Sequence, residues 1–215
     1  MSISTTYFVN TTVAADNAAE VYAWLQKNAT EYFDSFAISE DSTTVSCFIG
    51  ALEAVTFGPF GAAGFAATVA LPNGETKTAK INSASAIQYM RKAVKTSNGI
   101  AFQIDSALTN PFFFVTKAAN GETAIVFSST EYMSTNTVKQ YAVIPTKDNA
   151  FSAFQVYYDI SANDYTSLAP IVCPGGTGYL PHIFRAVFNQ YRGTEGVITL
   201  CGKQYYTNGY LMLAL

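Results

Sequence analysis

The sequence predicts an α+β protein in which antiparallel β-sheet dominates, arranged like a sandwich, with two amphipathic helices in its N-terminal half. Short runs rich in Val, Ile, Thr, Tyr and Phe recur along the 215 residues, separated by Gly, Pro and Asn-Gly turns. Residues 17–33 and 84–96 space their apolar side chains three and four apart, as amphipathic helices do. In one run Phe154, Val156 and Tyr158 alternate with residues of the opposite face, which is typical of a sheet with one buried side.

The two predicted helices lie in the first part of the chain, residues 1–104. Asp16 or Asn17 is the expected N-cap of the helix near 17–33, because a short polar side chain can accept a hydrogen bond from the first turn. The second helix, near 84–96, carries basic residues in its last turns, where they favour the helix dipole.

The predicted strands of this first part are separated by a polar loop at 34–42 and by a hairpin turn at 72–75, which contains Asn-Gly. These strands are residues 3–13, 43–49, 52–57, 65–71, 76–81 and 100–104.

The second part, residues 105–215, is predicted to be mainly β, and the two parts form either two units or one continuous domain. Residues 170–181 hold three prolines and three glycines and are expected to form an ordered loop. Residues 183–191 fit either a strand or a short helix. The predicted strands are residues 111–117, 123–128, 138–144, 151–160, 197–201, 204–207 and 210–215.

The composition is poor in charge: 49% of the residues are apolar and only 13% are charged. Either the fold has a surface of Ser, Thr, Asn and Ala, or the chain is a subunit that hides surface against neighbours; we favour the second, since obligate interfaces resemble a divided core. A net charge of −3 argues against non-specific binding to nucleic acid. The one basic cluster is interpreted as a solvated face rather than a phosphate site; it comprises Lys77, Lys80, Arg91, Lys92 and Lys95.

No apolar run approaches the roughly 20 residues of a membrane-spanning helix. The first residues lack the basic and apolar regions of a signal peptide, so we expect synthesis and folding in a cytoplasm.

No catalytic arrangement is recognisable. His182 is the only histidine, and Cys47, Cys173 and Cys201 lie far apart without a Cys-x-x-Cys pair, which argues against structural zinc. A Cys173–His182 dyad is conceivable, but no flanking signature accompanies it, and a structural histidine is the simpler interpretation. We therefore predict a non-enzymatic protein with no cofactor and no metal.

The chain ends on an apolar run, although free chain ends are normally loose and solvated. We expect this end to be held in a sheet or against a partner. The candidate assembly contacts are Tyr210, Leu211, Met212, Leu213, Leu215, Pro174 and Tyr179.

The last quarter of the chain resembles small virion structural proteins of tailed phages and prophages of gut bacteria. The resemblance lies in Tyr179-Leu180-Pro181-His182-Ile183-Phe184 and in the turn Gly202-Lys203-Gln204-Tyr205-Tyr206-Thr207-Asn208-Gly209, which precedes a final apolar strand. It implies an oligomeric head or tail accessory protein, located in the virion, made in the host bacterial cytoplasm and in contact with itself or other virion proteins. The alternative is a carbohydrate- or receptor-binding β-module that uses exposed tyrosines as stacking platforms.

Overall fold

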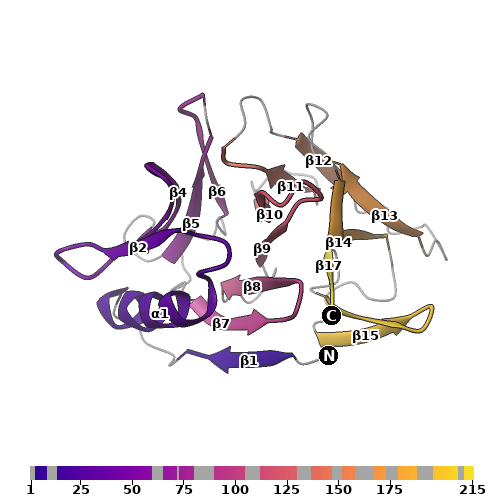
Figure 1. The fold of residues 1–215 in the computed structure, drawn as a ribbon, viewed down its shortest axis with the longest axis horizontal. Helices are drawn as coiled ribbons and strands as arrows, with labels where there is room; N and C mark the ends of the chain where they lie inside the picture. The colour runs from indigo at the N-terminus through magenta and orange to yellow at the C-terminus, as the bar shows by residue number, and fades with distance from the viewer. Residues whose placement is uncertain are drawn as a thin grey trace.

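The fold is dominated by antiparallel β-strands that form three sheets, and one α-helix is present in the part of the chain described (Figure 1). The computed structural model describes residues 3–8, 14–59, 65–71, 73–79, 90–104, 112–129, 137–146, 152–157, 167–172, 179–187, 196–207 and 211–215.

The largest sheet, here called the central sheet, has seven strands. In spatial order they are β1 (Ser4–Tyr7), β7 (Met90–Lys95), β8 (Gly99–Ile104), β9 (Phe112–Lys117), β10 (Thr123–Ser129), β11 (Thr137–Val143) and β12 (Ser152–Tyr157). All neighbours are antiparallel, and the predicted division near residue 104 falls between β8 and β9, which pair with each other.

Two five-stranded sheets accompany the central sheet. The N-terminal sheet has the order β2 (Ser35–Ile38), β3 (Val45–Ile49), β4 (Leu52–Pro59), β5 (Phe65–Ala70) and β6 (Thr76–Ala79). The C-terminal sheet has the order β13 (Ser167–Val172), β14 (Tyr179–Val187), β17 (Leu211–Ala214), β16 (Lys203–Thr207) and β15 (Gly196–Leu200).

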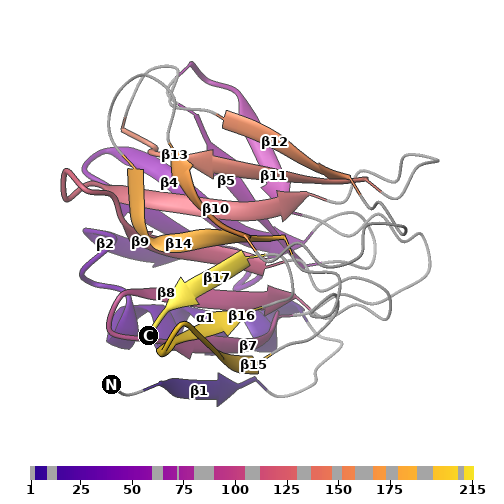
Figure 2. The same ribbon diagram turned by 90° about the vertical axis from the view of Figure 1, so that its right-hand side faces the viewer.

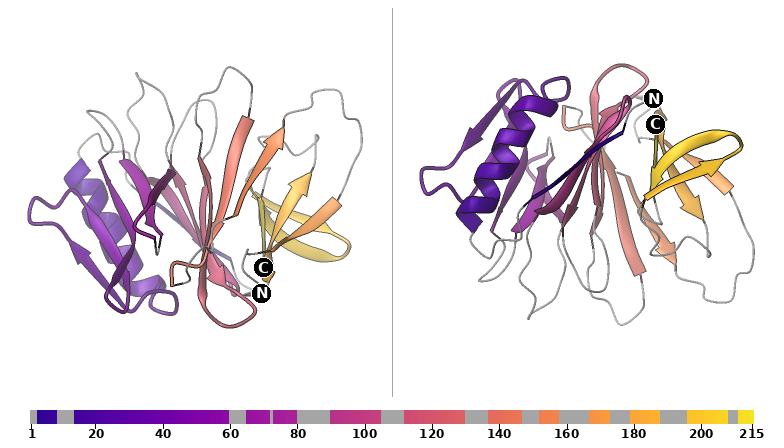
Figure 3. Two further views of the ribbon diagram at one scale, coloured as in Figure 1. Left: turned by 90° about the horizontal axis from the view of Figure 1, so that it is seen from above. Right: turned by 90° about the horizontal axis from the view of Figure 1, so that it is seen from below.

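The three sheets form layers, with the central sheet in the middle (Figure 3). The helix α1 (Ala14–Asn28) and the N-terminal sheet pack on one face of it, around a first core that contains Phe57, Phe102 and Phe113. The Phe57 ring lies 5.4 Å from that of Phe113, nearly at right angles, a favoured aromatic geometry.

The C-terminal sheet covers the other face through a second core, which includes Ala101, Phe114 and Leu213. Successive strand residues point to opposite faces, so Phe113 enters the first core and Phe114 the second. The central sheet is thus buried on both faces.

The predicted second helix, residues 84–96, is wrong where the structure describes it, because residues 90–95 form β7 between β1 and β8. Met90 and Ala93 face the first core, whereas Val94 faces the second. The strand has a register shift between Met90 and Lys92, and it is buried on both faces. Together these two features place apolar residues three and four apart in the sequence, as in a helix.

The first helix is confirmed, but α1 begins at Ala14 and ends at Asn28 rather than spanning 17–33. Asp16 and Asn17 therefore lie inside the helix and neither is its N-cap. The Asn17 side chain instead binds the backbone of Met90, accepting from its N–H at 2.9 Å and donating to its carbonyl at 3.2 Å. This pair of hydrogen bonds joins the helix to the central sheet.

Two predicted loops contain strands. Residues 35–38 of the predicted loop 34–42 form β2, whose half-buried Phe36 and Ile38 pack against the first core. The loop predicted at 170–181 is wrong at both ends, where β13 and β14 lie. Pro170 is accommodated because β13 is an edge strand with a register shift at that residue.

Candidate functional site

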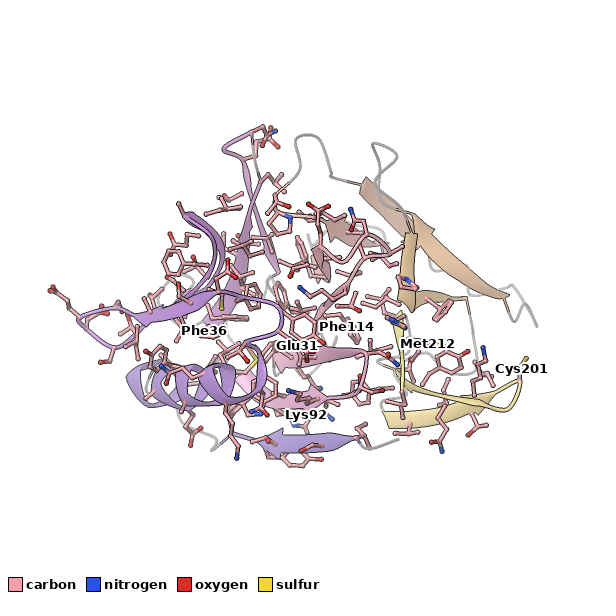
Figure 4. All side chains as sticks on the ribbon, in the orientation of Figure 1. Glu31, Phe36, Lys92, Phe114, Cys201 and Met212 are labelled. Atoms are coloured by element: carbon pink, nitrogen blue, oxygen red, sulfur yellow. The ribbon has the colours of Figure 1, made fainter. Side chains whose placement is uncertain are left out.

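The predicted assembly contacts at the chain end lie inside the protein. Leu211 and Leu213 are fully buried in the second core, and Leu215 is 7% exposed. Met212 points to the other face of the C-terminal sheet and is buried with Tyr205 (Figure 4). Tyr179 begins β14, whereas Tyr210 and Pro174 lie outside the described residues.

The end of the chain is held in the C-terminal sheet. β17 lies between β14 and β16 and pairs with both. The Leu215 N–H donates to the Gln204 carbonyl at 3.0 Å, and the Asn98 amide donates to the Ala214 carbonyl at 3.2 Å. Attachment of this end within a sheet is therefore confirmed, while a role in assembly stays a prediction.

Cys173, the partner considered for His182, lies outside the described residues, and the other residues considered for catalysis lie apart. His182 is half-buried in β14, Cys47 is buried in the first core, and Cys201 is exposed at the β15–β16 turn. Burial raises the pKa of the Cys47 thiol, which keeps it protonated and unreactive. Among the described residues, no three His, Cys, Asp or Glu side chains are close enough to hold a metal ion.

One unusual polar arrangement lies between the central and C-terminal sheets. Tyr7 of β1 pairs with Lys92 of β7, which pairs in turn with Gln103 of β8. Cross-strand partners project to the same face, so these three side chains form a row across one end of the central sheet. The neighbouring row, which contains Val94 and Ala101, faces the second core, so the polar row extends the face covered by the C-terminal sheet.

Lys92 occupies the middle of this row and is only 7% exposed (Figure 4). Its ammonium lies 5.8 Å from the ring centre of Tyr7 and 5.6 Å from that of Tyr206 of the C-terminal sheet, within the range of cation–π attraction. Removal from water, together with the nearby Arg91, lowers the pKa of Lys92 to about 8. The solvated face predicted for the basic cluster is therefore wrong for Lys92.

Gln103 is fully buried, and within the described part of the chain neither its amide nitrogen nor its amide oxygen has a hydrogen-bond partner. Such a group costs about 1–3 kcal/mol relative to a satisfied one, so an unsatisfied amide in a native structure calls for an explanation. We define the Lys92 site as Tyr7, Lys92, Gln103 and Tyr206.

Exposed apolar side chains gather beside this site. Among the described residues, the large apolar side chains that are exposed are those of Ile3, Tyr7 and Val197, at 38%, 68% and 46%. Ile3 directly precedes β1, Tyr7 is its last residue, and Val197 belongs to β15. β1 and β15 are edge strands of two different sheets. Both strands lie at the same end of the molecule (Figures 1 and 2). We call these three residues with the two strands the β1–β15 rim.

Part of the Lys92 site can be recognised in the sequence. Gln103 interrupts the apolar run Ile100-Ala101-Phe102, which is a signal for a polar group in a buried strand. Its proximity to Lys92 and Tyr206 depends on strand register and on the packing of two sheets, which no local pattern shows.

In the described residues, no helix is long and apolar enough to span a membrane. Comparison of the chain with protein-family models, with curated proteins and with solved structures finds no match.

Proposed function

We propose that the protein is a non-enzymatic structural subunit of a phage or phage-like particle, a head or tail accessory protein that works through contacts with copies of itself or with other virion proteins. Its place in a virion rests on the resemblance of the C-terminal quarter. The observation that carries the contact function is the β1–β15 rim, where the exposed large apolar side chains of the described residues gather.

The rim strands lack charged residues and prolines, two of the features that limit edge association. Edge strands of soluble proteins commonly carry Lys or Pro, as β6 does with Lys77 and β13 with Pro170. β1 and β15 contain neither a charged residue nor a proline. Among the described strands, each pairs on one side only, β1 with β7 and β15 with β16. A neighbour that adds a strand at this rim would gain backbone hydrogen bonds and cover Val197.

The test is the molar mass of the full chain by size-exclusion chromatography with light scattering over a series of concentrations. We expect association that Val197→Asp weakens at least tenfold, because a carboxylate would enter an apolar contact. Thr76→Asp, which adds the same charge at an exposed position of β6, is the matched control and should associate like the unaltered protein. A monomer at every concentration, or equal loss with both variants, would contradict the proposal.

The particle context has its own test. Portal, capsid or tail genes on either side of the coding gene would support it, and incorporation into purified particles would be measured by mass spectrometry. Particles that lack the protein while such genes surround it would argue against a virion position.

A second candidate function is binding of a carbohydrate or receptor. It is favoured by Tyr7, a residue that is 68% exposed, with its ring near the Lys92 ammonium.

A further inference from the structure

The rim strand β15 is the outer strand of a tight hairpin, whose geometry determines which of its backbone groups face the free edge. Cys201 and Gly202, with φ angles of 48° and 74°, form a two-residue turn of type I′ between β15 and β16. The residues that flank such a turn, Leu200 and Lys203, form a hydrogen-bonded pair, and the next pair along an antiparallel ladder is not hydrogen-bonded. Thr199 therefore does not direct its backbone groups to β16.

A hydrogen bond on the other side of β16 supports the same alternation. The carbonyl of Gln204, the residue opposite Thr199, accepts from the Leu215 N–H at 3.0 Å, so it points to β17 and away from β15. The N–H and C=O groups of Thr199, and those of Val197 two residues before it, therefore project from the free edge of β15. This strand lies at the lower border of the C-terminal sheet in Figure 1, and no described strand pairs with its free edge.

The outward backbone groups of β15 match those of a second copy of β15 that runs antiparallel to it. When the two strands pair about Ile198, Val197 of each copy lies opposite Thr199 of the other, and both pairs are hydrogen-bonded. A shift by one residue would place outward groups opposite groups that already bind β16. A shift by two residues would leave Val197 or Thr199 opposite a position outside the strand. The register about Ile198 is thus the one that uses all the outward groups of both residues.

The side chains of β15 also fit a second copy in this register. Ile198 and Leu200 lie on the face of the C-terminal sheet that carries Tyr205 and Met212, and both are half-buried beside them. The two Ile198 side chains would be directly opposed, and Leu200 would face Gly196, which leaves room for it. Since β15 has no charged residue, no like charges would oppose each other, and the apolar cluster of one copy would continue into the next.

We infer that two copies of this chain associate by antiparallel pairing of β15 with β15, centred on Ile198, which joins two C-terminal sheets into one. This inference rests on the proposed function, contact through the β1–β15 rim, and adds the partner, the strand and the register. The pair has a two-fold axis, because each strand presents the same residues to the other. Two edges of five residues bury less than the roughly 1,200–2,000 Å² of a stable interface, so we expect a dissociation constant above about 1 μM.

The other rim strand, β1, is less suited to pairing with its own copy. It has only four residues, and a short edge strand is one of the features that limit edge association. Three of the four are Ser or Thr, so pairing would remove little apolar surface from water. β15 offers Val197, Ile198 and Leu200 to the same contact.

The test is disulfide cross-linking of the full chain with Cys201→Ser as the background, because the Cys201 thiol is exposed. Ile198→Cys places two thiols at a directly opposed pair without hydrogen bonds, where Cα atoms lie about 4.5 Å apart, within the range of a disulfide. In this register the two Cα atoms of residue 200 lie about 14 Å apart, so Leu200→Cys is the matched control on the same face. We expect Ile198→Cys to form a covalent dimer at least tenfold faster, with the linked thiols identified by peptide mass spectrometry.

Thr6→Cys in the same background tests β1. The Phe8 N–H donates to the Arg91 carbonyl at 3.0 Å, so Phe8 and Thr6 direct their backbone groups to β7, as Ile198 does to β16. Cross-linking of Thr6→Cys or Leu200→Cys as fast as that of Ile198→Cys would overturn the inferred pairing. Association of reduced Ile198→Cys in light scattering without a cross-link on oxidation would also overturn it, but would keep the proposed contact function. A monomer at every concentration would overturn both.

A proline at position 199 tests the backbone contact while it spares the hairpin. The Thr199 N–H faces the free edge, where a strand tolerates the loss of a donor. Thr199→Pro should therefore keep the far-UV circular dichroism of the unaltered protein and weaken association at least tenfold, since both copies lose a hydrogen bond. Thr5→Pro removes the corresponding N–H of β1 and should associate like the unaltered protein. Equal loss with both prolines, or loss with neither, would overturn the assignment to β15.

Discussion

The close approach of Gly99 and Leu213 tests how the C-terminal sheet packs on the central sheet. A Cβ atom added at Gly99 would lie 2.9 and 3.3 Å from the two δ carbons of Leu213, and 2.7 Å from the Val115 carbonyl oxygen. Real Cβ atoms do not approach so closely, so Gly99→Ala must shift its surroundings and should cost about 1–3 kcal/mol. Leu213→Ala leaves a cavity in the second core and should cost about 2–5 kcal/mol.

The two changes should be strongly coupled when combined. Truncation of Leu213 gives the new methyl group at Gly99 the space that it lacked, so the double variant should be more stable than the sum predicts by about 0.5–3 kcal/mol. The relief is incomplete because the Val115 carbonyl belongs to the backbone and stays in place.

The measurement is the free energy of unfolding in urea for the four proteins of this cycle, with far-UV circular dichroism as the probe. Gly58→Ala is the matched control: its Cβ would lie 2.8 Å from the hydroxyl oxygen of Thr44, which directly precedes β3 of the N-terminal sheet, so its combination with Leu213→Ala should be additive to within about 0.5 kcal/mol. Additive effects of Gly99→Ala and Leu213→Ala would refute this packing of the two layers.

Three further changes test other parts of the fold. The Lys92 pKa is about 8 in the folded chain and about 10.4 when unfolded, so the unfolded state holds more protons between these two pH values. The free energy of unfolding of the unaltered protein, measured in urea, should therefore rise relative to that of Lys92→Met from pH 8 to about pH 10. A constant difference between the two proteins would contradict the burial of this charge. Asn17→Ala leaves the Met90 N–H without its partner and should cost about 1–3 kcal/mol by thermal unfolding, whereas a change below about 0.5 kcal/mol would show that the pair is not formed. Deletion of residues 210–215 removes β17 from the middle of the C-terminal sheet and should leave insoluble protein in a sedimentation assay; a soluble, folded product would argue against that position.

The strands were predictable where their signals are local. The hairpin at 72–75 and the strand pairs β9–β10 and β16–β17 combine β-forming residues with short turns, and these pairings occur in the structure. The prediction of a helix at 84–96 failed because the spacing of its apolar residues reflects tertiary packing and not a helix. Ala93 and Val94 are both buried, yet each faces a different core, which only the three-layer arrangement explains.

The Lys92 site was predictable only in pieces. Gln103 stands out in an apolar run, but Lys92 looked like one member of a basic cluster on a helix. The register between β7 and β8 places Lys92 beside Gln103, and packing between sheets brings Tyr206 to the ammonium. A sequence contains the residues of such a site but does not show contacts that are set by tertiary pairing.

The low charge and the apolar chain end have an explanation within the chain itself. A sheet buried on both faces needs apolar residues at nearly every strand position, as in Ile100-Ala101-Phe102, so a three-layer fold of this size uses much of its apolar content internally. The final leucines complete one of these layers, with Leu211 and Leu213 fully buried.

The composition therefore no longer distinguishes a subunit from a solitary protein, since both would have the same low charge and high apolar content. The feature that supports the proposed assembly is the rim, where Val197 and Tyr7 remain exposed after both cores are filled. The proposal of assembly thus depends on two uncharged edge strands, and changes at Val197 test it while leaving the cores intact.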